Sequence, residues 1–170
     1  MARLVRGDLV DPNEIAAFHC ISRTVRRSFL CGRDAVSGRD YEHRRNWIEQ
    51  RIQFLAGQFG IDVLGFAVMS NHLHLVLRSR PDVVAQWSDE EAVRRWLLIC
   101  PAHRNNDGSP AEPTAPELNA RLNSPQWLQQ IRARLSDISW FMRLTAEPIA
   151  RRANREDNAR VIFGKAGSNR

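Results

Sequence analysis

The sequence predicts an α+β protein, a ferredoxin-like sandwich in which helices cover one face of an antiparallel sheet and a C-terminal helical extension follows. Two observations predict this fold: residues 14–100 show the order strand, helix, strand, strand, and residues 118–158 show helical periodicity. The length of 170 residues suits a single domain. We expect an α+β core at 14–100, a flexible loop at 101–117, C-terminal helices at 118–158 and a tail at 159–170.

The first strand is expected between Ile15 and Arg23, and the first long helix between Tyr41 and Phe59. Arg44 and the other charged residues of this helix, Arg45, Glu49 and Arg51, are expected on faces other than the apolar one. Gly60 follows it directly, in the position where glycine commonly ends a helix. The apolar residues of the helix recur at three- and four-residue intervals: Trp47, Ile48, Ile52, Leu55, Ala56 and Phe59.

A β-hairpin is predicted at residues 61–78, where two apolar runs flank the turn formers Ser70 and Asn71. His72 and His74 are two residues apart, so a strand places both imidazoles on one face and the leucines between and after them on the other. Two neighbouring imidazoles are a common protein contribution to a divalent-metal site. The competing interpretation is a pair of ordinary exposed histidines, because two ligands do not complete a coordination shell.

His19 lies on the first strand and shares a face with Ile21. We expect it to be a partly buried strand histidine with a structural role. Further along, Ser88 and Glu91 have the spacing of a capped helix start. Helical spacing resumes at Pro125, and Pro148 is expected to kink this last helical region or to begin a new helix, because proline cannot donate to the carbonyl four residues earlier.

The chain is strongly basic, with a net charge of +6, and Lys165 is its only lysine. Arginine binds phosphate through two parallel hydrogen bonds, so the composition favours a nucleic-acid partner. A cluster of arginines follows the first strand. These residues are candidates for phosphate contacts, and the equally supported alternative is a solvated loop. Its members are Arg23, Arg26, Arg27 and Arg33.

Three cysteines without a Cys-x-x-Cys pair indicate neither a disulfide framework nor a zinc knuckle. The sequence contains no apolar run of the length that spans a bilayer, and residues 1–11 lack the apolar segment of a signal peptide. We therefore expect a cytoplasmic protein that does not associate with membranes.

Three segments together closely resemble the REP-associated tyrosine transposases, which belong to the single-tyrosine HUH endonucleases. The most specific segment is Met-Ser-Asn-His-Leu-His at residues 69–74, and the resemblance in order and spacing runs from Arg6 to Arg155. The other segments are Phe-His-Cys-Ile-Ser-Arg at 18–23, and Trp-Phe-Met-Arg at 140–143 with Arg-Arg-Ala-Asn-Arg at 151–155.

This resemblance implies metal-dependent cleavage and joining of single-stranded DNA at hairpin, REP-like sequences. In such enzymes Mg²⁺ or Mn²⁺ polarises the scissile phosphate, and a tyrosine on a C-terminal helix attacks phosphorus to form a 5′-phosphotyrosine. Carried onto this sequence, the metal ligands are His72, His74 and Asn154. The resemblance also implies DNA contacts by Arg151, Arg152 and Arg155, association with the nucleoid, and compatibility with a homodimer.

The chain departs from the family at the nucleophile. One helical turn before Asn154, where the family has tyrosine, this sequence has Ala150, and its only tyrosine is Tyr41. Alanine cannot attack phosphorus. Either Tyr41 or a metal-bound water acts instead, or the protein is a degenerate relative that binds DNA without forming the covalent link.

Two other functions remain open from the sequence. A non-enzymatic module derived from a transposase would bind hairpin DNA or RNA through backbone charge and would not need metal. A metal-dependent nuclease or phosphodiesterase acting on small substrates has less support, because no cluster of carboxylates lies near the histidines in the sequence.

Overall fold

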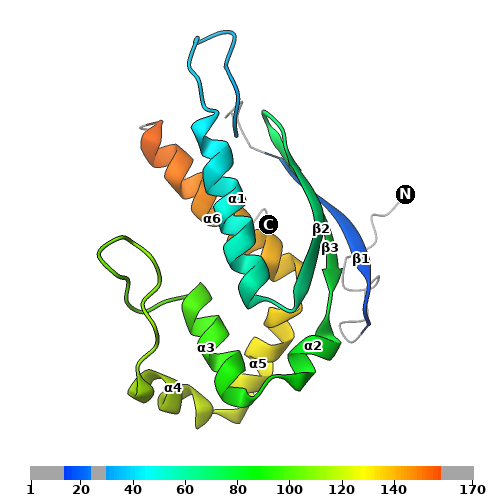
Figure 1. The fold of residues 1–170 in the computed structure, drawn as a ribbon, viewed down its shortest axis with the longest axis vertical. Helices are drawn as coiled ribbons and strands as arrows, with labels where there is room; N and C mark the ends of the chain where they lie inside the picture. The colour runs from blue at the N-terminus through cyan, green and yellow to red at the C-terminus, as the bar shows by residue number, and fades with distance from the viewer. Residues whose placement is uncertain (1–13, 24–29, 158–170) are drawn as a thin grey trace, which may run out of the picture.

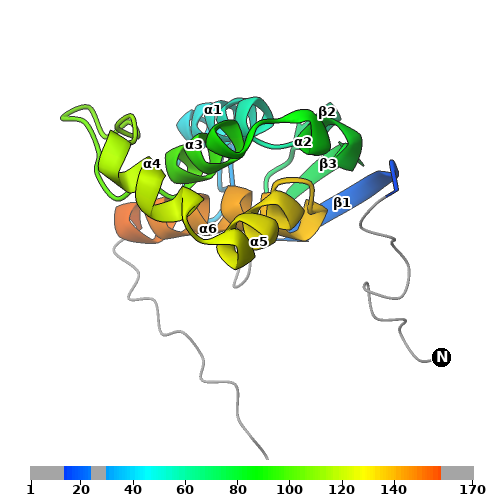
Figure 2. The same ribbon diagram turned by 90° about the horizontal axis from the view of Figure 1, so that it is seen from below.

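The computed structural model describes residues 14–23 and 30–157. Within them the predicted α+β architecture is confirmed: a three-stranded antiparallel sheet has the order β1-β3-β2, and helices lie on one side of it (Figures 1 and 2). The strands are β1 (Ala17–Arg23), β2 (Ile61–Val68) and β3 (His72–Ser79). The helices are α1 (His43–Gln58), α2 (Pro81–Gln86), α3 (Asp89–Ile99), α4 (Ala115–Leu122), α5 (Pro125–Leu135) and α6 (Ile138–Glu156).

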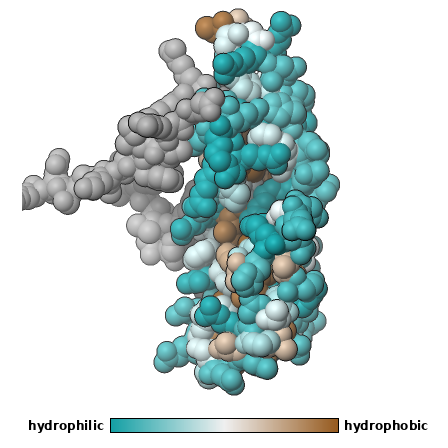
Figure 3. Space-filling model, turned by 90° about the vertical axis from the view of Figure 1, so that its left-hand side faces the viewer, coloured by the Kyte–Doolittle hydropathy of each residue, from teal (hydrophilic) through white to brown (hydrophobic). Residues whose placement is uncertain are grey.

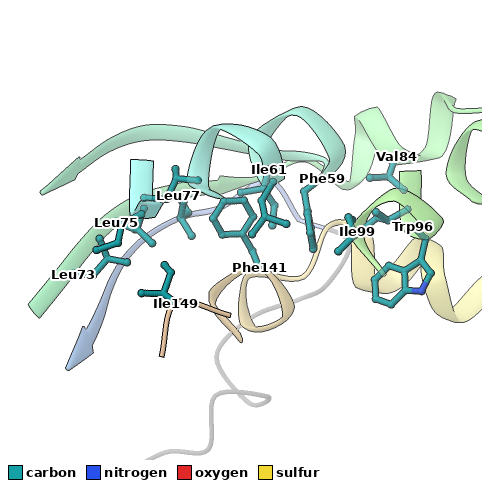
Figure 4. Close-up of a cluster of buried hydrophobic side chains, with 14 of the residues drawn as sticks. Phe59, Ile61, Leu73, Leu75, Leu77, Val84, Trp96, Ile99, Phe141 and Ile149 are labelled. Carbon is teal, nitrogen blue, oxygen red and sulfur yellow. The ribbon is translucent and has the colours of Figure 1, made fainter. Parts of the chain in front are cut away.

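β3 is the central strand, and the alternation of its side chains decides which face of the sheet is covered. Leu73, Leu75 and Leu77 are almost completely buried and point toward α6, where Phe141 and Ile149 meet them (Figure 4). α1 packs against the same core through its own buried residues, Ile48, Ile52 and Leu55. The side of the molecule formed by the helices and loops is mainly hydrophilic (Figure 3), as expected when helices turn their apolar stripes toward a sheet.

Gly60 follows the C-cap residue Phe59, as the sequence predicts, but the reason for glycine here is space. A Cβ at this position would lie 2.3 Å from Cγ2 of Val84. The chain therefore passes close to α2 where it leaves α1, and a larger residue at position 60 would separate the two helices.

Pro148 does not begin a new helix, although a new helix is one of the two outcomes that the sequence predicts for it. The chain breaks at Ser136 and Asp137, where the Asp137 carboxylate accepts hydrogen bonds from two backbone amides, those of Ser139 and Trp140, and α6 then continues through Pro148. Proline leaves the Leu144 carbonyl without its helical donor. Arg51 of α1 takes that place, because its Nε donates to the Leu144 oxygen at 2.9 Å.

Replacing Arg51 by alanine is expected to lower the free energy of unfolding by about 1–3 kcal/mol, the usual cost of leaving a buried acceptor without its donor. Arg51→Lys retains a donor and should lose less. Urea unfolding followed by circular dichroism measures both changes. Equal stability of wild type and Arg51→Ala would show that the Leu144 carbonyl does not depend on this guanidinium.

The loop predicted at 101–117 is shorter than expected, since α4 begins at Ala115 after a Thr114 capping box. The loop has hydrogen bonds of its own: Arg104 pairs with Pro110 in an isolated bridge, and Asn105 N donates to Ser109 O at 2.9 Å. The predicted tail at 159–170 lies outside the described residues.

Candidate metal and nucleic-acid site

His72 and His74 lie together on the face of the sheet that the described helices leave open. Both are partly exposed, in contrast to the buried leucines that alternate with them. Their ring centroids are 6.1 Å apart. On the same face Ile21 is 53% and Val76 40% exposed, so within the described part of the chain no element covers this surface.

The hydrogen bonds of the two rings use the same nitrogen. Nδ1 of His72 lies 2.7 Å from Oδ1 of Asn71, and Nδ1 of His74 lies 3.0 Å from Nε2 of His19. Nε2 of each ring is therefore the nitrogen left for a ligand, which it can bind when it carries the lone pair. This donor arrangement fits a divalent cation held by two neutral imidazoles.

His19 is the functional candidate that the sequence prediction missed. It is exposed rather than partly buried, and its ring stacks on His74 with centroids 5.2 Å apart and planes inclined by 25°. Antiparallel pairing places Ile21 opposite His74, which makes His19 the diagonal neighbour of His74 across the two strands. The two-residue period of a strand predicts which face of β1 carries His19, but it does not predict that β1 pairs with β3.

In the described residues, no group of three or more His, Cys, Asp or Glu side chains could hold a metal ion. A cation at His72 and His74 would therefore complete its shell with other ligands, such as water or phosphate oxygens. Two neutral ligands leave the charge of the cation uncompensated, which favours contact with an anionic phosphate.

Asn154 and Ala150 come from α6, which packs on the leucine side of the sheet. Ala150 is exposed and Asn154 is partly buried, while Ile149, which directly precedes Ala150, faces the core. The imidazoles lie on the opposite side, and their hydrogen bonds go to Asn71 and His19. The structure therefore does not bring Asn154 to the two histidines within the described chain.

Tyr41 lies just before α1, near the turn between β2 and β3. Its amide donates to the Gly32 carbonyl at 2.9 Å, and its ring lies 4.2 Å from the guanidinium carbon of Arg44. The neighbouring segment is attached to the turn, since Leu30 N donates to Ser70 O at 2.6 Å. Tyr41 is thus at the same end of the sheet as His72, but it precedes a helix that packs on the leucine side.

The predicted DNA-binding arginines occupy two regions. Arg23 ends β1, is exposed and pairs in register with His72, so it lies on the sheet beside the imidazoles. Arg33 is exposed in the loop before α1. The α6 arginines are exposed on the helix side: Arg151 pairs with Glu147, Arg152 lies 3.7 Å from the Trp47 ring centroid, and Arg155 is in the last turn. Arg26 and Arg27 lie outside the described residues.

Arg78 shares the open face but is already paired. Its Nε and Nη2 both donate to Oδ2 of Asp62, at 2.9 and 2.7 Å. These hydrogen bonds, followed by one from Arg80, hold the pKa of the Asp62 carboxyl below its ordinary value. Asp62 therefore stays ionised to lower pH than a free carboxyl and keeps Arg78 neutralised, which leaves Arg23 as the candidate phosphate contact next to the histidines.

None of the helices in the described chain is long and apolar enough to cross a membrane. No protein-family model, curated protein or solved structure matches the chain.

Proposed function

We propose that this protein is a transposase-like DNA-binding protein of the HUH class, which binds single-stranded or hairpin DNA and holds Mg²⁺ or Mn²⁺ at His72 and His74. The observation that carries the proposal is the pair of imidazoles on the open face of the sheet, with Nδ1 engaged and Nε2 left for a ligand. Exposed Arg23 lies opposite His72 and would contact the DNA backbone. When bound, the cation would polarise a phosphate oxygen of the strand.

Cleavage and joining of the strand are the part of this function that the geometry supports least. α6 carries Ala150 at the position where the family that this chain resembles has its nucleophilic tyrosine. The helix α6 also packs on the leucine side of β3. This observation favours the second candidate, a module that binds hairpin DNA or RNA without cutting it. Both candidates use the open sheet face, and they differ in whether a metal is needed.

Titration calorimetry with Mn²⁺ tests the metal site. Wild-type protein is expected to bind Mn²⁺, and the double variant His72→Ala, His74→Ala is expected to lose that binding, because both imidazole ligands are removed. Asn154→Ala is the matched variant on α6, and it should bind as the wild type does if Asn154 stays on the other side of the sheet. Equal titration curves for the wild type and the double variant would refute a cation at these histidines.

Incubation with labelled single-stranded hairpin DNA and Mn²⁺ distinguishes the two candidates. A denaturant-resistant protein–DNA adduct would support strand cleavage, and its loss in Tyr41→Phe would identify the nucleophile. Hairpin binding that survives a chelator, with no nicking, would support the non-enzymatic module. Such binding should weaken steeply as salt is raised, since phosphate contacts release counterions.

A further inference from the structure

Asn71 accepts a hydrogen bond from His72, and this determines where the His72 proton lies. The amide oxygen Oδ1 of Asn71 can only accept, so at 2.7 Å the Nδ1 of His72 must carry the hydrogen. A neutral imidazole with its proton on Nδ1 has a lone pair on Nε2. His72 is therefore held in the form that can ligate a cation through Nε2.

The contact between His74 and His19 joins two ring nitrogens, so one of them must donate. If Nδ1 of His74 donates to Nε2 of His19, then Nε2 of His74 carries a lone pair and His19 carries its own proton on Nδ1. The reverse arrangement would put a proton on Nε2 of His74 and prevent it from binding metal. Only the first arrangement makes His74 equivalent to His72.

We infer that Asn71 and His19 are positioning residues, which hold His72 and His74 in the Nδ1-protonated tautomer so that both rings present Nε2 to one divalent cation. The inference rests on the proposed metal site and adds the two residues that prepare it. Partners of this kind, on the second nitrogen of a ligating histidine, fix its tautomer and ring orientation, and their loss commonly costs about 10–100-fold in metal affinity.

The fold supplies both partners from outside the strand that carries the ligands. Asn71 belongs to the turn that joins β2 to β3, and its position is set by the hydrogen bond from Met69 N to His72 O at 2.8 Å. His19 reaches His74 diagonally from β1, whose pairing with β3 runs along the whole strand. Preparation of the metal site thus depends on the antiparallel register of β1 and β3.

Nitrogen-15 NMR of the histidine rings tests the inference before any metal is added. In wild-type protein near pH 8, where imidazole in water is neutral, long-range proton–nitrogen spectra should show hydrogen on Nδ1 and none on Nε2 for both His72 and His74. Hydrogen on Nε2 of either ring would overturn the inference for that ring. This measurement needs no variant, so it does not depend on whether a substituted protein folds.

Paired substitutions then separate tautomer control from simple packing. Asn71→Ala and His19→Ala are expected to release the tautomer of His72 and His74 respectively and to weaken Mn²⁺ binding by about 10–100-fold. Asn71→Asp keeps an oxygen acceptor, and His19→Gln puts an amide oxygen in place of the ring nitrogen, so both should restore the tautomer and most of the affinity. Ile21→Val, on the same strand and face, is the control that should change neither.

The outcomes distinguish this inference from the proposed function. Failure of the wild type to bind Mn²⁺, with both tautomers as expected, would overturn the proposed metal site and leave the tautomer assignment standing. Wild-type Mn²⁺ binding that is unchanged in Asn71→Ala and His19→Ala would overturn the positioning role and leave the metal site standing. Loss of affinity without rescue by Asn71→Asp and His19→Gln would also contradict positioning through an acceptor.

Discussion

Replacing Arg44 by alanine is expected to lower the free energy of unfolding by about 3 kcal/mol, the low end of the cost of breaking a buried ion pair. Arg44 is 1% exposed, although the sequence predicts it outside the apolar face of α1. Its Nε donates to Glu156 at 2.9 Å and its Nη2 to Asp157 at 2.5 Å. The low end applies because the side chains of Glu156 and Asp157 remain 35% and 25% exposed, so water partly solvates the carboxylates left behind.

Chemical denaturation with urea measures this loss, and two variants make it specific. Arg44→Lys keeps the charge but cannot donate to both carboxylates in the same geometry, so an intermediate loss is expected. Arg155→Ala removes an exposed arginine from the same end of α6 and should change the stability by no more than about 0.5 kcal/mol. If Arg44→Ala and Arg155→Ala lowered the free energy of unfolding by similar amounts, a specific role for the buried Arg44 ion pairs would be contradicted.

The ion pairs of Arg44 with Glu156 and Asp157 also bear on the candidate site. Arg44 joins the beginning of α1 to the end of α6, and Arg45 next to it donates to the Val68 carbonyl at 3.0 Å, at the end of β2. The two arginines thus hold the ends of both helices near the hairpin turn that precedes His72. A protein that loses Arg44 is expected to loosen the end of the molecule where the candidate site lies.

The second large effect is expected at Leu75, in the middle of the central strand. Leu75 is 0% exposed, and Leu75→Ala should cost about 2–5 kcal/mol, because the substitution leaves a cavity between the sheet and the helices. The adjacent residues His74 and Val76 point to the open face, where Val76 is 40% exposed. Val76→Ala and His74→Ala should each cost less than about 1 kcal/mol.

Thermal or urea unfolding of the three variants tests whether β3 has one buried face and one exposed face. The expected order is a large loss at position 75 between two small ones. A loss at Val76 as large as that at Leu75 would mean that the face carrying the imidazoles is covered in solution. That result would also remove the accessible surface on which the proposed function depends.

The sequence predicted the fold class and the paired faces of β3, because both depend on local periodicity. Apolar residues at helical spacing mark α1, and alternation in β3 separates the leucines from His72 and His74. The hairpin turn is also local, since Ser70 and Asn71 are turn formers between two apolar runs. These features require no knowledge of distant parts of the chain.

Tertiary structure alone decided which residues join the histidines and which do not. His19 meets His74 because β1 pairs with β3 in one register, and Asn154 is kept from them because α6 packs on the leucine side. Arg44 is buried and Pro148 is accepted within α6 because partners distant in sequence, Glu156 for Arg44 and Arg51 for the Leu144 carbonyl, supply the missing interactions. Local periodicity predicts on which face of a helix or strand a residue lies. Which other element covers that face depends on how the whole chain packs.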